Sequence, residues 1–218
     1  DDKFNLNANL KFLFQIIFLV LVVLTDSNLK IQFLYFASFN YTYFLNDISF
    51  MFSVICILIF INALNMYDGI NLQVGIYSLI IFIALMYFSK EYIFLSALII
   101  SLVVFLILNN RSIIFLGDSG SNLLGYIISF IIIYEANTPN YPNLSVENIF
   151  ILMMLPGIEL IRLFVIRLSK GRHPFSADNK HIHHLLISKN GYFKTILFTK
   201  FFVISPIILM ILLKDYYL

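Results

Sequence analysis

The stretch ISFMFSVICILIFINALNM, residues 48–66, is apolar along almost its whole length. A helix of about 20 such residues is long enough to cross the hydrocarbon core of a bilayer. The rest of the chain has the same character, because 61% of its residues are hydrophobic and only 12% are charged, against about 25% charged in soluble domains. A soluble core built from 218 residues cannot hide that much apolar surface. The sequence therefore predicts a protein that lies in a membrane.

Six further segments repeat this pattern, and the polar residues fall mainly between them. We expect an all-α, polytopic transmembrane helical bundle of about seven spans: 11–24, 48–66, 72–88, 91–108, 121–135, 148–166 and 195–213. No linker divides the chain, so residues 1–218 are expected to form a single domain. Residues 29–45 are too polar to cross a membrane, but their aromatic and β-branched content predicts a small hairpin on its surface.

The chain begins DDKF, without Met. We therefore expect a piece of a longer protein, with further spans before residue 1. The single cysteine, Cys56, lies in an apolar segment and can form neither an internal disulfide nor a cysteine metal cluster. We interpret it as an ordinary buried side chain.

Basic residues are distributed unevenly between the two ends of the predicted spans. With the loops assigned alternately, one side receives Lys3, Lys11, Arg111, Arg167, Lys170, Arg172, Lys180, Lys189 and Lys194, with Arg162 and Lys200 close to the same surface, and the other only Lys30, Lys90 and Lys214. Lys and Arg mark the cytoplasmic face, so the first side, with its basic and histidine-rich loop at 167–194, is expected to be cytoplasmic. The same side receives Asp1, Asp2, Asp68, Asp118 and Asp178. This clustering of aspartates on one side indicates a shared polar site. The net charge is only +2, and we expect no nucleic-acid partner.

Two of the acidic loops lie early in the chain. Asp1 and Asp2 are adjacent, and their mutual repulsion suits a general base or a magnesium neighbourhood, although a solvated chain start would look the same. The second loop, NALNMYDGINLQVG at 62–75, places Asn62 and Asn65 on one helix face before Asp68. A plain helix stop explains the following glycine but not two amides and an acid at the end of an apolar span.

The third loop is IIFLGDSGSNLLG, residues 113–125, in which glycines flank Asp118. An acid between glycines at a helix start leaves backbone N–H groups free to face a phosphate, with the carboxylate available for Mg²⁺. A structural turn is the alternative for this motif.

The fourth loop, GRHPFSADNKHIHHLL at 171–186, contains every histidine of the chain. His181 and His184 are three apart and would share a helix face, whereas His183 would point elsewhere. Arg172 suits phosphate oxygens. A zinc site assisted by Asp178 is the rival interpretation, and a charged surface loop with incidental histidines is another.

The four motifs in this order resemble the polyprenyl-phosphate N-acetylhexosamine-1-phosphate transferases, over residues 1 to about 190, and most closely the branch that transfers N-acetylglucosamine 1-phosphate. The resemblance implies transfer of this group from a UDP-N-acetylhexosamine to undecaprenyl phosphate, with release of UMP, at the start of a lipid-linked cell-envelope glycan. It also implies a Mg²⁺ cofactor, with Mn²⁺ as an alternative, and a multi-pass protein of the bacterial inner membrane whose active site faces the cytoplasm. A homodimer is compatible with it.

By the same resemblance each motif residue receives a role. Asp118 and Asp68 would bind the metal, and Asp1 and Asp2 would position the lipid phosphate or accept its proton, in one displacement or through an aspartyl-phosphate. Phe115 corresponds to an aromatic residue that lies against uracil. The remaining substrate-binding residues would be Asn62, Asn65, Asn71, Arg172, His181, His183 and His184.

The sequence departs from the family pattern at two positions. Asn71 stands where the family commonly has an acid associated with the nucleotide base, which puts the details of uridine recognition in question, and Glu159 stands where relatives often carry Asp. Two other functions remain open: an inactive transferase fragment, and a transporter with a cytoplasmic regulatory loop. A transporter needs ionisable residues at membrane depth, and Glu159 and Arg162 are the candidates, unless they pair with each other. N-acetylglucosamine is the first choice of sugar, followed by 6-deoxy N-acetyl sugars, and the glycan could be O-antigen or teichoic acid.

Overall fold

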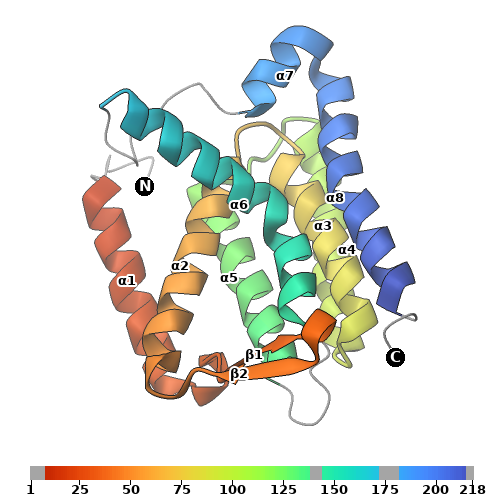
Figure 1. The fold of residues 1–218 in the computed structure, drawn as a ribbon. Helices are drawn as coiled ribbons and strands as arrows, with labels where there is room; N and C mark the ends of the chain where they lie inside the picture. Colours follow the sequence, from red (N-terminus) through yellow and green to blue (C-terminus); the bar gives the residue numbers. More distant parts are fainter. Residues whose placement is uncertain (1–7, 138–143, 172–181, 215–218) are drawn as a thin grey trace.

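The computed structural model describes residues 8–137, 144–171 and 182–214. Seven long helices run between two ends of the molecule (Figure 1): α1 (Ala8–Thr25), α2 (Ser49–Tyr67), α3 (Gln73–Phe88), α4 (Tyr92–Asn110), α5 (Gly117–Ala136), α6 (Val146–Ser169) and α8 (Tyr192–Lys214). They correspond to the seven predicted spans, and the all-α membrane fold is confirmed. A short additional helix, α7 (Ile182–Asn190), lies next to the start of α8 at one end of the bundle.

Five of these helices, α2, α4, α5, α6 and α8, are long and apolar enough to cross a membrane. The apolar parts of α1 and α3 that the structure describes are shorter, at 10–17 residues each. An apolar solvent offers no hydrogen-bond partner, so each crossing segment must satisfy its backbone internally, which a helix does.

The end opposite α7 carries the predicted hairpin (Figure 1). Strand β1 (Phe33–Phe36) pairs antiparallel with β2 (Tyr41–Phe44), with Phe33 opposite Phe44. Short 3-10 turns precede, connect and follow the strands at Ser27–Leu29, Ala37–Phe39 and Asn46–Ile48. The carboxylate of Glu147, in the first turn of α6, accepts hydrogen bonds from the backbone N–H groups of Ala37 and Ser38 at 3.2 and 3.1 Å. These two hydrogen bonds attach the hairpin to α6.

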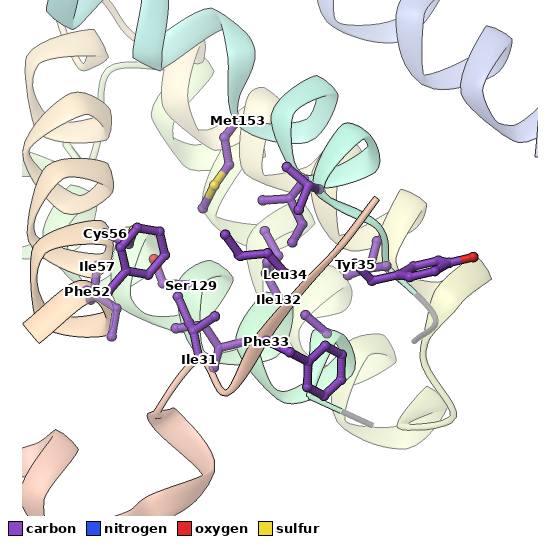
Figure 2. Close-up of a pocket in the computed structure, with 15 residues that line it drawn as sticks. Ile31, Phe33, Leu34, Tyr35, Phe52, Cys56, Ile57, Ser129, Ile132 and Met153 are labelled. Carbon is purple, nitrogen blue, oxygen red and sulfur yellow. The ribbon is translucent and has the colours of Figure 1, made fainter. Parts of the chain in front are cut away.

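An apolar pocket of about 230 Å³ lies under this hairpin (Figure 2). Its lining comes from β1, α2, α5 and α6 and contains no charged residue. Cys56, a free and partly exposed cysteine, forms part of its wall. The lining of this pocket therefore offers no carboxylate, imidazole or basic side chain to a substrate.

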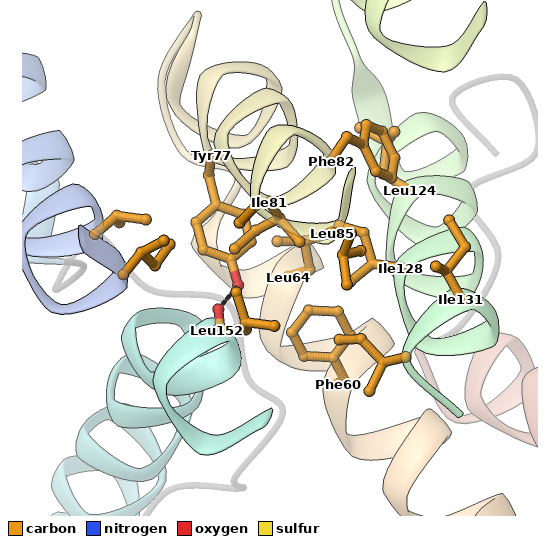
Figure 3. Packing of buried hydrophobic residues seen from close by; sticks show 14 of the residues in the cluster. Phe60, Leu64, Tyr77, Ile81, Phe82, Leu85, Leu124, Ile128, Ile131 and Leu152 are labelled. Atoms are coloured by element: carbon orange, nitrogen blue, oxygen red, sulfur yellow. Dashed lines mark hydrogen bonds between the residues drawn. The ribbon is translucent and has the colours of Figure 1, made fainter. Parts of the chain in front are cut away.

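The main core lies between α2, α3, α5 and α6 (Figure 3). Phe82 and Leu85 of α3 pack against Ile128 of α5, and all three are completely buried. Within this core the hydroxyl of Tyr77 donates a hydrogen bond of 2.7 Å to the carbonyl of Leu152 in α6. A buried hydroxyl needs such a partner, and this bond ties α3 to α6.

Helices α2 and α5 approach closely at Gly125, where an added Cβ would lie 3.0 Å from the Cα of Ile61. We expect Gly125→Leu to lower the stability by about 1–3 kcal/mol, as overpacking usually does, because the two helices would have to separate. Thermal unfolding in detergent, followed by circular dichroism, measures the effect.

Gly157→Leu in α6 is the matched control, because a Cβ there meets no atom of the described chain within 4 Å. Equal melting temperatures for the two variants would contradict the close approach of α2 and α5.

Candidate active site

At the end of the bundle where α7 lies, a second pocket of about 150 Å³ opens between the α2–α3 loop and the α4–α5 loop. Unlike the pocket under the hairpin, it is lined by a carboxylate and two amide side chains as well as by apolar groups. Asp68 and Asn71 come from the first loop, Asn109 from the end of α4, and Phe115 and Gly117 from the approach to α5. Two of the motifs singled out in the sequence therefore share one pocket.

The α2–α3 loop, Asp68–Leu72, is shaped by hydrogen bonds at both ends. The N–H of Asp68 still bonds to the carbonyl of Leu64, closing α2. At the other end the N–H of Leu72 donates to the side-chain oxygen of Asn109 at 2.8 Å, and the amide of Asn109 donates to the carbonyl of Ile114, also at 2.8 Å. Asn109 is buried and so joins the two loops that form the pocket. The sequence analysis missed it, although an amide that ends an apolar span is the same signal that identified Asn65.

Asp118 lies in the first turn of α5, directly after Gly117, which has a left-handed φ of +63°. A carboxylate is favourable at this end of a helix because of the helix dipole. Its oxygens accept hydrogen bonds from Lys11 of α1 and Asn65 of α2, both at 3.2 Å, and the amide of Asn65 also reaches the hydroxyl of Ser121 at 2.9 Å. Asp118 thus lies where α1, α2 and α5 meet.

Asp68 is partly buried and senses the charge of Asp118. Burial raises its pKa to about 7, and the nearby negative charge of Asp118 adds to this increase. Both effects disfavour the ionised form of a carboxylate. At neutral pH Asp68 can therefore accept or release a proton, and a bound cation would stabilise its ionised form.

His183, in α7, lies against the α2–α3 loop. Its imidazole is completely buried and so close to Gly69 that a Cβ at position 69 would overlap the ring. Only glycine leaves room for this contact. The fourth motif is thereby brought next to the second.

Glu159 of α6 contacts the start of α7. One oxygen of its buried carboxylate accepts the N–H of Ile182, at the start of α7, at 2.9 Å. The same carboxylate makes two hydrogen bonds of 2.8 Å with Arg162. Glu159 and Arg162 are therefore paired with each other, as the sequence allowed, and the acid at this position connects α6 to α7.

Other predicted site residues have different surroundings. The amide of Asn62 donates to Gln15 at 3.2 Å and to the carbonyl of Leu58 at 2.8 Å, so it links α1 to α2 and does not line the pocket. The amide of Asn71 donates to Ser112 at 3.1 Å. Phe115 is 67% exposed at the pocket. Asp1, Asp2, Arg172 and His181 lie outside the described residues, as does the side chain of His184.

A metal cluster of three or more His, Cys, Asp or Glu side chains does not occur among the described residues. The acidic pair Asp68 and Asp118 is thus the candidate for holding a cation in this part of the chain. The rival zinc interpretation depends on His181 and Asp178, which the structure does not describe.

Comparison with known proteins gives a family and named relatives. The sequence model of glycosyl transferase family 4 matches residues 1–136. The undecaprenyl-phosphate alpha-N-acetylglucosaminyl 1-phosphate transferase of Escherichia coli O157:H7 is 27% identical over 198 residues, covering 86% of this chain and 53% of that protein. The protein of that name from Yersinia pestis is 27% identical over 86% of this chain and 54% of its own length. The one from Haemophilus influenzae is 32% identical over 97 residues, 42% of this chain and 27% of its own length. The chain spans about half the length of the enterobacterial relatives.

The raised pKa of Asp68 predicts a pH-dependent stability. In the folded state the Asp68 carboxyl has a pKa of about 7 and is protonated below that pH. In the unfolded chain the same carboxyl loses its proton near pH 4. The unfolding free energy should therefore fall as the pH rises from about 4 to 7, and this contribution should stay constant above 7. Asp68→Asn removes the ionisation, so we expect its melting temperature to exceed that of the wild type by a few degrees at pH 8 and by less at pH 5.

Thermal unfolding in metal-free detergent solution at the two pH values measures this difference. Asp47→Asn, an exposed acid at the hairpin end, is the control and should show no such trend. A melting-temperature difference for Asp68→Asn that does not change with pH would show that Asp68 keeps an ordinary pKa.

Proposed function

Because the chain belongs to glycosyl transferase family 4, we propose that it transfers N-acetylglucosamine 1-phosphate from a UDP-sugar to undecaprenyl phosphate, releasing UMP and starting a lipid-linked cell-envelope glycan. An oxygen of the lipid phosphate forms a bond to the phosphorus that carries the sugar. The bond from that phosphorus to the oxygen shared with UMP breaks. The names of the relatives support this choice of sugar and lipid.

The observation that carries the proposal is the coupled acidic pair, Asp68 and Asp118, at the end of an apolar helical bundle. The phosphate of a polyprenyl lipid lies at the membrane surface, and a nucleotide sugar is a water-soluble molecule. A site at the ends of the spans is accessible to both. Because both substrates are anionic, the reaction requires groups that reduce their mutual repulsion.

A Mg²⁺ ion would supply this charge neutralisation, with Mn²⁺ as an alternative. The residues fit such an ion, because Mg²⁺ commonly takes one or two carboxylates and completes its shell with water and substrate phosphates. Asp118 and Asp68 are the two carboxylates we propose. Burial and the negative charge of Asp118 raise the pKa of Asp68, and a cation bound between the two carboxylates would offset both effects by stabilising their ionised forms.

The protein itself would orient the substrates around this pair. We propose that Phe115, exposed at the pocket, stacks on the uracil ring, since an aromatic face tolerates any flat base. Asn71 is the adjacent polar residue for the nucleotide. His183 would act next to Asp68 by packing on Gly69, together with the proposed sugar and diphosphate ligands Arg172, His181 and His184. The proposed partners of the lipid phosphate are Asp1 and Asp2.

We place the protein in the bacterial inner membrane with the pocket facing the cytoplasm. The pocket end of the bundle carries most basic residues of the described chain: Lys11, Arg111, Arg162, Arg167, Lys170, Lys189 and Lys194. The hairpin end carries Lys30, Lys90 and Lys214, the last residue of α8. Such an excess of Lys and Arg marks the cytoplasmic side.

The test of the function is a transfer assay with the intact protein in membranes, UDP-N-acetylglucosamine and undecaprenyl phosphate. We expect Asp118→Asn to reduce kcat/KM at least about 100-fold, the loss typical of removing an electrostatic stabiliser of the transition state. Asp47→Asn, remote from the pocket, is the matched control. EDTA should stop the wild type, and Mg²⁺ should restore it.

Release of UMP with no lipid-linked sugar product would reject the transfer reaction. Substantial turnover in EDTA, with the Asp118 variant active, would reject the metal assignment and leave the transfer reaction standing.

The orientation has its own test. In a Cys56→Ala background, Ser188→Cys in α7 should be labelled by a membrane-impermeant thiol reagent only after the cells are opened. Ser38→Cys in the hairpin should be labelled in intact spheroplasts, because both side chains are exposed at opposite ends of the bundle. Labelling of Ser188→Cys in intact spheroplasts would place the pocket on the outer face.

A further inference from the structure

Lys200 is an unusual residue in α8. Its place in the sequence predicts a position close to the cytoplasmic surface, whereas in the structure Lys200 is only 6% exposed. It lies about 12 Å along the helix from Tyr192, within a segment long and apolar enough to cross a membrane. Ionisable residues in such segments are costly, and they persist mainly where they have a function.

The ammonium group of Lys200 contacts both ends of the α2–α3 loop. It donates a hydrogen bond to the carbonyl of Gln73, the first residue of α3. It also lies over the ring of Tyr67, the last residue of α2, at 5.6 Å from the ring centroid. A cation at this distance from an aromatic face is attracted by the ring. One side chain of α8 therefore joins the residue before the loop to the residue after it.

The loop needs such a hold because it contains a strained residue. Leu72 has a φ of +69° and a ψ of −16°, in the left-handed region that a leucine rarely adopts. Strain of this kind persists only where the surroundings over-determine the conformation. Besides the bond from Leu72 to Asn109, the hydroxyl of Tyr192 donates to the carbonyl of Asn71 at 2.8 Å. Tyr192 and Lys200 of α8 thus both contact the loop region.

The surroundings of Lys200 are more polar than helix packing requires. The hydroxyl of Tyr67 and the side-chain amide of Gln73 are buried. Within the described part of the chain neither makes a hydrogen bond of ordinary length and angle, although Gln73 and Thr199 both lie close enough to the Tyr67 hydroxyl to interact with it. Buried polar groups are usually satisfied, and exceptions need an explanation. Their position on either side of Asp68–Leu72 points to support of the loop.

We propose that Lys200 is a positioning residue: it holds the strained α2–α3 loop in the conformation that places Asp68 and Asn71 at the pocket. The consequence for catalysis rests on the proposed transferase function, whereas the structural hold does not.

Amide hydrogen exchange of the intact protein in nanodiscs tests the hold directly. Lys200→Met keeps the length of the side chain and removes the charge. We expect the backbone amides of residues 69–73 to exchange roughly tenfold faster or more than in the wild type. This is the rate increase that corresponds to the loss of one hydrogen bond from a charged group. The other helices should keep their exchange rates. Tyr192→Phe removes the second contact and should give a smaller change in the same residues.

The matched control is Lys194→Met, an exposed lysine of the same helix, which should leave the loop unchanged. Leu72→Asn provides the rescue, because asparagine adopts the left-handed conformation more readily than leucine. In the Lys200→Met background it should slow the loop exchange again. A general packing defect would not respond to this second substitution.

The transfer assay then separates the two hypotheses. If the transferase function and the role of Lys200 are both correct, Lys200→Met raises KM for UDP-N-acetylglucosamine and for Mg²⁺ at least about tenfold while the protein remains folded. The reason is that the α2–α3 loop carries proposed ligands for both. A wild type without transfer activity, together with faster loop exchange in Lys200→Met, would reject the function and leave the hold intact. Unchanged loop exchange in Lys200→Met, or exchange that increases equally in all helices, would overturn the proposal.

Discussion

Hydrocarbon offers no hydrogen bond to a peptide group, and the rest of this structure follows from that constraint. A segment in such a solvent must satisfy its backbone internally, so the seven apolar segments are helices. The same solvent excludes charged side chains from most of their length and moves them to the ends. The polar groups then have only two places in which to meet, the hairpin end and the end that carries α7. The lining of the two pockets shows the result, since only the pocket near α7 contains a carboxylate.

The helices and the hairpin could be predicted because their signals are local. An apolar run reveals a span, and an aromatic, β-branched stretch that is too polar to cross reveals a strand pair at the surface. The motifs also identified the family correctly, since the order of four short stretches is information contained in the chain itself. The spacing of the histidines suggested a helix in the fourth motif, but neither the bounds of α7 nor its contact with Glu159 could be predicted. That contact joins residues distant in the sequence.

The details of the site were harder to predict because they depend on how helices face one another. Asn62 and Asn65 looked equivalent in the sequence, three residues apart and both followed by an acid. In the structure the amide of Asn65 bonds to Asp118 of α5, whereas the amide of Asn62 bonds to Gln15 of α1. The difference arises because α1 packs against the side of α2 that carries Asn62. The burial of Lys200 was missed for the same reason: its polarity suggested a surface, but its partners lie on α2 and α3.

The contact between Gly69 and His183 has a consequence for how such a sequence can change. The imidazole occupies the space in which a side chain at position 69 would have to lie. A substitution at either position alone is therefore disfavoured, because it leaves an overlap or an empty space, and the two sites are expected to covary among relatives. A sequence with alanine at position 69 should carry a smaller residue in place of the histidine. We therefore expect two motifs more than a hundred residues apart to change together in evolution.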